Sequence, residues 1–187
     1  MRVIGGHARG RLLRAPAGSS TRPTSDRVRE AVFSILSSMQ RIEGATVLDL
    51  FAGSGALGIE SLSRGASRAV LVDRSAEAVS AIRQNLGVLG SGAEAATVVR
   101  ADAARFLESA PRFDVVLADP PYRYDRWDEV LALLSGLAGL LVVETGSGWE
   151  PGPEWETMKV RRYGGTVVTI ARPAAQANVV RAEEGDS

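Results

Sequence analysis

The sequence predicts an α/β protein built on a mainly parallel sheet, and two observations support that fold class. Between residues 45 and 145, apolar runs of about five residues alternate with segments of helical periodicity. Most runs are apolar throughout, as strands are when helices cover both faces of a parallel sheet. Two later runs flank the pair Gly164 and Gly165, which indicates a closing antiparallel hairpin. The expected architecture is Rossmann-like, with a seven-stranded sheet.

The first 42 residues are predicted to precede this α/β domain as a separate segment. Residues 1–14 mix short apolar pairs with glycine and arginine, which favours a small hairpin or extended arm over a helix. A loop follows from Pro16 to Pro23, and Thr24 or Ser25 is expected to cap a helix that begins near Asp26. One face of that helix is apolar, and its other face is expected to expose Arg27, Arg29 and Glu30.

The remaining elements follow in chain order. Strands are expected at residues 46–51, 68–73, 95–101, 113–118, 140–144, 156–163 and 166–172. Helices are expected up to Leu62, from Ala76 to Leu86, up to Leu107, and from Val130 to Leu137. We therefore divide the chain into a basic appendage at 1–42, a catalytic domain at 43–172 and a disordered tail at 173–187.

Composition excludes several classes of protein. The chain has 187 residues, 45% of them apolar, with no cysteine and one histidine, His7. The absence of cysteine removes disulfides, thiolate nucleophiles and zinc–cysteine sites, and a single histidine removes any two-histidine metal motif, so no metal is expected. No apolar run approaches the roughly 18 residues of a spanning helix, and no signal pattern opens the chain. A cytoplasmic protein without a membrane partner is expected.

The charge is balanced overall but unevenly distributed. The chain carries 22 basic and 22 acidic side chains, yet residues 1–42 hold eight arginines against Asp26 and Glu30. This segment therefore has a formal charge of plus six, and the remainder of the chain has minus six. A basic segment on an acidic body is suited to holding a polyanion, although a solvated surface is the simpler alternative.

A glycine-rich turn follows the first predicted strand. Residues 49–58 contain G-x-G-x-x-G at Gly53, Gly55 and Gly58, and such glycines allow a ligand to approach the backbone at the start of a helix. Asp73 ends the next strand, where its carboxylate can accept hydrogen bonds from ribose hydroxyls. This pair predicts a nucleoside-bearing cofactor, either a dinucleotide or S-adenosylmethionine.

The fourth predicted strand ends in Asp-Pro-Pro-Tyr, residues 119–122. Proline restricts the backbone, so the Asp119 carboxylate and the Pro120 carbonyl are held in place and can both accept hydrogen bonds from one NH2 group. Tyr122 can stack on the ring that bears this group, an interaction of about 1–3 kcal/mol. The motif is suited to a planar substrate with an exocyclic or amide NH2.

These motifs together resemble class I S-adenosylmethionine-dependent N-methyltransferases. Residues 2–13 and 21–33 look like the N-terminal signatures of the RsmD family, whose members methylate N2 of a guanine in 16S rRNA, conventionally guanine 966. The resemblance covers about residues 1–172, and one departure is His7, where lysine or another polar residue is expected. It implies catalytic roles for Asp119, Pro120 and Tyr122.

The same resemblance implies the cofactor contacts. Asp49, Gly53 and Gly55 would line the methionine part, Asp73 would hold the ribose, and Asp102 would contact the adenine amine. Asp49 has an alternative role in stabilising the turn through backbone amides, and Asp102 as the cap of the next helix. Glu144 is interpreted as a surface carboxylate. Further cofactor contacts are expected from Phe51, Arg74 and Ala103.

The basic segment is expected to bind the RNA. Flipping the target base out of its stack costs a few kcal/mol, which phosphate contacts can offset. We expect these contacts from Arg9, Arg11, Arg14 and Arg27, whereas Arg22 and Thr24 would close over the active site. The expected partner is 16S rRNA within a partly or fully assembled small ribosomal subunit, bound by a monomer.

Other functions remain open at this point. Asp-Pro-Pro-Tyr does not distinguish guanine from another NH2 acceptor, in DNA adenine or cytosine or on protein glutamine. An NAD-dependent oxidoreductase would share the glycine-rich turn but would leave the Asp-Pro-Pro-Tyr motif and the basic segment without a role. A non-catalytic RNA-binding module is a further alternative, and calorimetry with S-adenosylmethionine and with NAD separates the three.

Overall fold

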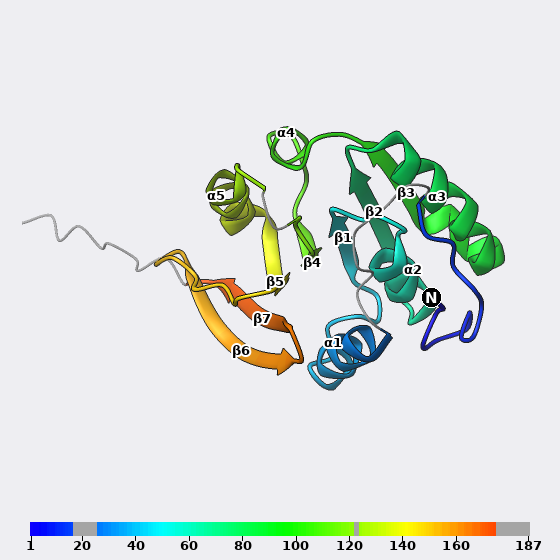
Figure 1. Ribbon diagram of the computed structural model, residues 1–187, viewed down its shortest axis with the longest axis horizontal. Coiled ribbons are helices and arrows are strands. Elements are labelled where there is room, and N and C mark those ends of the chain that lie inside the picture. The colour runs from blue at the N-terminus through cyan, green and yellow to red at the C-terminus, as the bar shows by residue number, and fades with distance from the viewer. Residues whose placement is uncertain (17–25, 122–123, 175–187) are drawn as a thin grey trace, which may run out of the picture.

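The computed structural model describes residues 1–16, 26–121 and 124–174, which form a seven-stranded sheet with helices on both faces (Figure 1). The strand order is β3-β2-β1-β4-β5-β7-β6. Strands β1 to β5 are parallel, and β7 runs antiparallel to both β5 and β6. The strands are β1 (Thr46–Leu50), β2 (Arg68–Asp73), β3 (Ala96–Arg100), β4 (Phe113–Ala118), β5 (Ala138–Thr145), β6 (Trp155–Tyr163) and β7 (Thr166–Pro173). The predicted fold class is confirmed.

The helices also lie close to their predicted positions. They are α1 (Asp26–Ser38), α2 (Ala56–Ser63), α3 (Ala76–Leu86), α4 (Ala103–Leu107) and α5 (Trp127–Leu137). One element was not predicted, the 3-10 helix η1 (Gly87–Ala95), whose backbone is interrupted at Gly90. Its three-residue turn gives no 3.6-residue apolar period to detect. Within the described part of the chain, no helix has the length and apolar character needed to cross a membrane.

Two apolar layers cover the two faces of the sheet. Helices α1, α2 and α3 pack on one face, and α4 and α5 pack on the other (Figure 1). Alternate residues of β1 serve opposite layers, since Val47 belongs to the first and Leu48 and Leu50 to the second. The apolar strand runs that predicted a parallel sheet with helices on both faces therefore contribute side chains to both core layers.

Residues 1–14, which we call the N-terminal arm, form an irregular hairpin that packs on α2. Arg2 and Leu12 make an antiparallel bridge, in agreement with the predicted hairpin. Val3, Ala8 and Leu13 are buried in the same core layer as α1 and α2. These three residues thus join the arm to the main core, while Leu12 and the arginines of the arm face outward.

Two charged side chains are buried where the sequence suggested exposure. Arg29 of α1 is fully buried, and its guanidinium donates to the carbonyl of Arg2 and to the Asp26 carboxylate, 2.5 and 2.8 Å away. Glu144 of β5 is only 4% exposed, and its charge attracts Arg29. Both predictions of surface positions were wrong, because α1 covers this part of the sheet and brings the two charges into one layer.

Candidate functional site

The carboxyl ends of β1, β2 and β4 lie side by side at one edge of the sheet. Leu50 of β1 pairs with Val72 of β2 on one side and with the last residue of β4 on the other. Phe51, Asp73 and Asp119 are the next residues in their segments, so they lie in one row at this edge. The parallel register therefore brings both motif aspartates beside the glycine-rich turn.

The glycine-rich turn, residues 51–58, needs its glycines for different reasons. Phe51, Gly53 and Gly55 have φ values of 72°, 53° and 77°, which is the left-handed region that glycine adopts without strain. A Cβ on Gly53 would meet nothing within 4 Å, whereas a Cβ on Gly58 would lie 2.7 Å from Leu71 Cδ2. Gly53 leaves open space at the edge, and Gly58 allows α2 to pack closely on β2.

Asp73 fixes the turn and still has acceptor capacity. Its Oδ2 accepts from the Gly53 amide and its Oδ1 from the Ser75 amide, each at 2.8 Å. A carboxylate offers about four lone-pair positions, so two backbone bonds leave acceptor sites for the hydroxyls of a ligand. This geometry suits the predicted ribose contact and also shows a structural role that the sequence did not suggest.

Asp49 is a buried carboxylate at the base of the turn. It is 1% exposed, and its Oδ2 accepts from the Gly58 amide at 2.8 Å, as its alternative interpretation predicted. Burial raises the pKa of Asp49 to about 7; the Gly58 amide opposes that shift, and the charges of Asp73 and Asp119 add to it. Asp73 and Asp119 both repel the charge of Asp49, and a cation bound near these carboxylates would relieve that repulsion.

Asp102 has both local and long-range partners. It caps α4 by accepting from the Arg105 amide at 3.4 Å, and it pairs with Arg126 Nη1 at 2.8 Å. The Tyr124 hydroxyl donates to the same carboxylate at 3.3 Å. The predicted cap is therefore present, Ala103 is the buried residue that follows it, and the adenine contact stays a prediction.

Aromatic side chains form a row along this edge that the sequence analysis missed. The ring of Phe51 lies 4.9 Å from that of Tyr124 and 6.2 Å from that of Trp127. Trp149 continues the row at 6.5 Å from Trp127, and Trp155 lies 6.1 Å beyond Trp149. Two aromatic residues three positions apart, shortly after the Asp-Pro-Pro motif, were the available signal. The row supplies an apolar wall beside the turn.

Asn85 of α3 is a second residue that the sequence analysis missed. It is 2% exposed, and its Oδ1 accepts from the Arg14 amide at 2.8 Å. Its Nδ2 donates to the carbonyls of Arg14 and Ser54 at 2.8 and 2.9 Å. Asn85 therefore joins the N-terminal arm to the glycine-rich turn. A lone asparagine late in a helix gives no sequence signal for such a role.

The other predicted site residues are placed as follows. Asp119 and Pro120 are partly buried, and Arg74 is exposed next to Asp73, with its carbonyl accepting from Arg100 Nε at 3.3 Å. Four of the predicted RNA contacts are exposed, Arg9, Arg11 and Arg14 on the arm and Arg27 on the first turn of α1. Three predicted residues, Tyr122, Arg22 and Thr24, lie outside the described residues.

The residues at this edge fit S-adenosylmethionine. Its sulfonium is a cation, which suits the charge environment of Asp49, Asp73 and Asp119. Its ribose hydroxyls match the remaining acceptor sites of Asp73, and Gly53 leaves room above the turn. Solved methyltransferases of the same fold hold S-adenosylmethionine or S-adenosylhomocysteine. S-adenosylmethionine, the cofactor predicted from the sequence, agrees with the chemistry of these residues and with the cofactors of these solved structures.

Comparison with known proteins identifies the relatives of the chain. The model of the family described as Conserved hypothetical protein 95 matches residues 1–172. A relative in Bacillus subtilis, "Putative rRNA methyltransferase YlbH", is 43% identical over 138 residues, which are 72% of this chain and 73% of the relative. "Ribosomal RNA small subunit methyltransferase D" of Escherichia coli K12 is 42% identical over 135 residues, which are 72% of this chain and 66% of that protein.

A solved structure extends the likeness over nearly the whole chain. The "Putative methyltransferase yhhF from Escherichia coli" has a TM-score of 0.81 and 35% identity, and the match covers 94% of this chain and 99% of that one. The family match includes the N-terminal arm, the glycine-rich turn and the Asp-Pro-Pro-Tyr motif within one segment. The chain therefore belongs to the RsmD family of class I methyltransferases.

Proposed function

We propose that the protein transfers a methyl group from S-adenosylmethionine to the exocyclic N2 amine of a guanine in small-subunit rRNA. One observation carries the proposal: Asp119 directly follows β4, so the Asp-Pro-Pro-Tyr motif begins beside the glycine-rich turn that follows β1. The names of the relatives support methylation of rRNA by this chain. The choice of guanine rests on the resemblance of the two N-terminal segments to the RsmD signatures.

S-adenosylmethionine, when bound, supplies a methyl group already activated on sulfur. The protein must therefore orient the amine and stabilise the charge that develops on nitrogen. The Asp119 carboxylate and the Pro120 carbonyl accept one hydrogen bond each from the two N–H groups. This arrangement directs the nitrogen lone pair towards the methyl group, and the carboxylate stabilises the positive charge. Transfer would form the methyl–nitrogen bond and break the methyl–sulfur bond, and the methylated amine would then release its proton to solvent, so no histidine base is needed.

The amine must also be reached within folded RNA. Base flipping exposes it at a cost of a few kcal/mol, and stacking on Tyr122 and contacts to phosphates offset that cost. The exposed arginines of the arm are our candidates for the phosphate contacts. They are held near the turn because Asn85 binds the backbone of Arg14 and of Ser54.

Methylation of rRNA can be tested directly. Small ribosomal subunits and transcribed small-subunit rRNA, both free of the modification, are incubated with the protein and labelled S-adenosylmethionine, and the label is mapped. We expect one labelled guanine and no label on DNA or protein. Label on adenine, on DNA or on glutamine would contradict the proposal. Calorimetry with S-adenosylmethionine and with NAD checks the cofactor independently.

The role of Asp119 has its own test. Asp119→Ala removes the acceptor, so turnover should fall by at least about 100-fold, an amount comparable to the loss of one electrostatic donor elsewhere. Cofactor affinity measured by calorimetry should fall far less than turnover, because Asp49 and Asp73 remain. Asp119→Asn keeps one accepting oxygen and should recover part of the activity. Full activity of the alanine variant would contradict this role.

A further inference from the structure

Two adjacent hollows lie along one side of α3 and are lined by four arginines. Arg83 and Arg100 line a hollow of about 430 Å³, and Arg11 and Arg14 line one of about 450 Å³. Gln84 borders both hollows, so they are neighbours, and we call the two together the α3 groove. No carboxylate and no aromatic ring belongs to either lining, within the residues that the structure describes.

The carboxylates that the structure describes leave most of the positive charge of the α3 groove unbalanced. Five other arginines of the chain make ion pairs with carboxylates within 4 Å, but none of the four groove arginines does so in the described segments. Glu77 is attracted to Arg100 but is held by the Ser75 hydroxyl at 2.6 Å. In a chain without net charge, the groove is therefore a local excess of positive charge.

The groove is also fixed to the candidate active site. Arg14 Nη1 donates to Gln84 Oε1 at 3.4 Å, which joins the arm side to the helix side. The buried Asn85 next to Gln84 holds the backbone of Arg14 and the carbonyl of Ser54 in the glycine-rich turn. At the other end, Arg100 ends β3 in the same row as Asp73. A preorganised surface of this kind loses less entropy when a ligand binds.

We propose that the α3 groove is a track for the phosphate backbone of the RNA substrate, which extends from the arm to the end of β3. The inference rests on the proposed function, since it names further contacts for the same RNA. Four arginines over two neighbouring hollows suit a polyanion better than a single phosphate. The absence of aromatic rings from the described lining indicates contact with phosphates and not stacking of bases. Arg83 and Arg100 are the residues that this track adds.

The test compares two double variants that remove the same charge. Arg83→Gln with Arg100→Gln changes the groove, whereas Arg68→Gln with Arg112→Gln changes two exposed arginines at the opposite edge of the sheet. Binding of transcribed small-subunit rRNA is measured from about 50 to 200 mM salt. The groove variant should reduce the slope of log K against log salt by about 1.4, at about 0.7 per phosphate contact. The control variant should keep the wild-type slope.

Each outcome decides between the two proposals. If the wild-type protein neither binds nor methylates the rRNA, the proposed function fails before any variant is compared. If the wild type binds and the groove variant keeps its affinity and slope, the track is wrong and the proposed function stands. An equal loss in both variants would show a general charge effect and would also overturn the track.

Two further measurements guard against misleading results. The groove variant should have the melting temperature of the wild type and the same affinity for S-adenosylmethionine. If the double variant does not fold, the single variants Arg83→Gln and Arg100→Gln replace it. Small ribosomal subunits are tested beside the transcribed rRNA. If the groove variant lost affinity for the subunits but not for the transcribed rRNA, the groove would bind an acidic protein of the subunit. That result would contradict an RNA track.

Discussion

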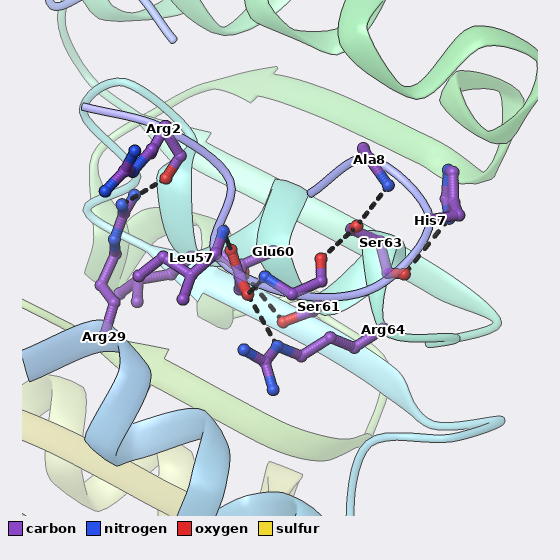
Figure 2. Close-up of polar contacts among 11 residues, drawn as sticks. Arg2, His7, Ala8, Arg29, Leu57, Glu60, Ser61, Ser63 and Arg64 are labelled. Atoms are coloured by element: carbon purple, nitrogen blue, oxygen red, sulfur yellow. Dashed lines mark hydrogen bonds and ion pairs between the residues drawn. The ribbon is translucent and has the colours of Figure 1, made fainter. Parts of the chain in front are cut away.

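Two buried carboxylates in the same layer of the molecule have opposite environments. Glu60 of α2 is fully buried and accepts from the amides of Ile4 and Gly5 and from Arg64 Nε, each at 2.7 Å (Figure 2). Asp49 of β1 is equally inaccessible, at 1% exposure, but it accepts from a single backbone donor among the residues that the structure describes. Equal burial therefore accompanies very different hydrogen bonding.

The difference shows what each carboxylate can do. The three donors around Glu60 use its lone pairs to hold the N-terminal arm on α2, so it is a structural anchor. Asp49 keeps unused acceptor capacity, and burial raises its pKa to about 7, so its charge is unfavourable in the isolated protein. A nearby cation would make that charge favourable. The number of donors, and not burial, separates the anchor from the candidate site residue.

The largest effect is expected from removing the anchor. Glu60→Ala leaves the amides of Ile4 and Gly5 and the Arg64 guanidinium without their acceptor, which should cost about 3–5 kcal/mol of unfolding free energy. Urea denaturation at neutral pH measures this loss. Glu60→Gln keeps one accepting oxygen and should cost less. An alanine variant within about 1 kcal/mol of the wild type would show that the three bonds do not anchor the arm.

Removing the charge of Asp49 should raise stability, whereas removing Glu60 lowers it, and the gain should depend on pH. Because its pKa is raised from 3.8 to about 7, the folded state binds more protons than the unfolded state between those values. The contribution of Asp49 to stability is therefore greatest below about pH 4 and is lost as the pH rises to about 7. Asp49→Asn cannot lose a proton, so its stability relative to wild type should rise across this range by up to about 4 kcal/mol.

The same variant should bind the cofactor less well. Without a carboxylate at position 49, a sulfonium loses a favourable electrostatic partner, so affinity for S-adenosylmethionine should fall at pH 8, as measured by calorimetry.

Denaturation curves of wild type and Asp49→Asn at pH 4, 6 and 8 measure the predicted difference in stability. A difference that does not change with pH would mean that Asp49 titrates normally in the folded protein.

The site carboxylates were predictable because their signals are local. Asp49 lies in the strand before a glycine-rich turn, and Asp73 and Asp119 follow apolar strands whose parallel pairing brings their ends together. The anchor was not predictable. Glu60 meets Ile4 and Gly5 across more than 50 residues of sequence, and no periodicity encodes that contact.

Long-range contacts account for the other errors as well. Arg29 was expected on the surface because charged residues seldom lie inside, yet the carbonyl of Arg2 and the carboxylate of Asp26 satisfy its guanidinium in part. The aromatic row depends on loops that bring Tyr124 and Trp149 to one edge. Sequence alone therefore predicted the strands and the cofactor turn better than it predicted how the arm is attached.

Two glycines of the arm allow a finer test of the anchor. Gly6 and Gly10 have φ values of 73° and 85°, so alanine at either position should cost about 1–2 kcal/mol. A Cβ at Gly6 would also lie 1.7 Å from the carbonyl oxygen of Ser63, whereas one at Gly10 would meet nothing within 4 Å. That oxygen already accepts from the His7 amide at 2.9 Å (Figure 2). Gly6→Ala should therefore displace the arm, and Gly10→Ala should leave it in place.

The two variants should differ in both stability and exchange. Gly6→Ala is expected to lose about 1–3 kcal/mol more than Gly10→Ala, the usual cost of overpacking. Hydrogen exchange should show faster exchange of the Ile4 and Ala8 amides in Gly6→Ala, because displacement of the arm moves these amides away from their acceptors on Glu60 and Ser63. Gly10→Ala should keep their protection. Equal exchange in both variants would mean that the arm relieves the clash by moving only at position 6. The displacement of the whole arm expected here would then be wrong.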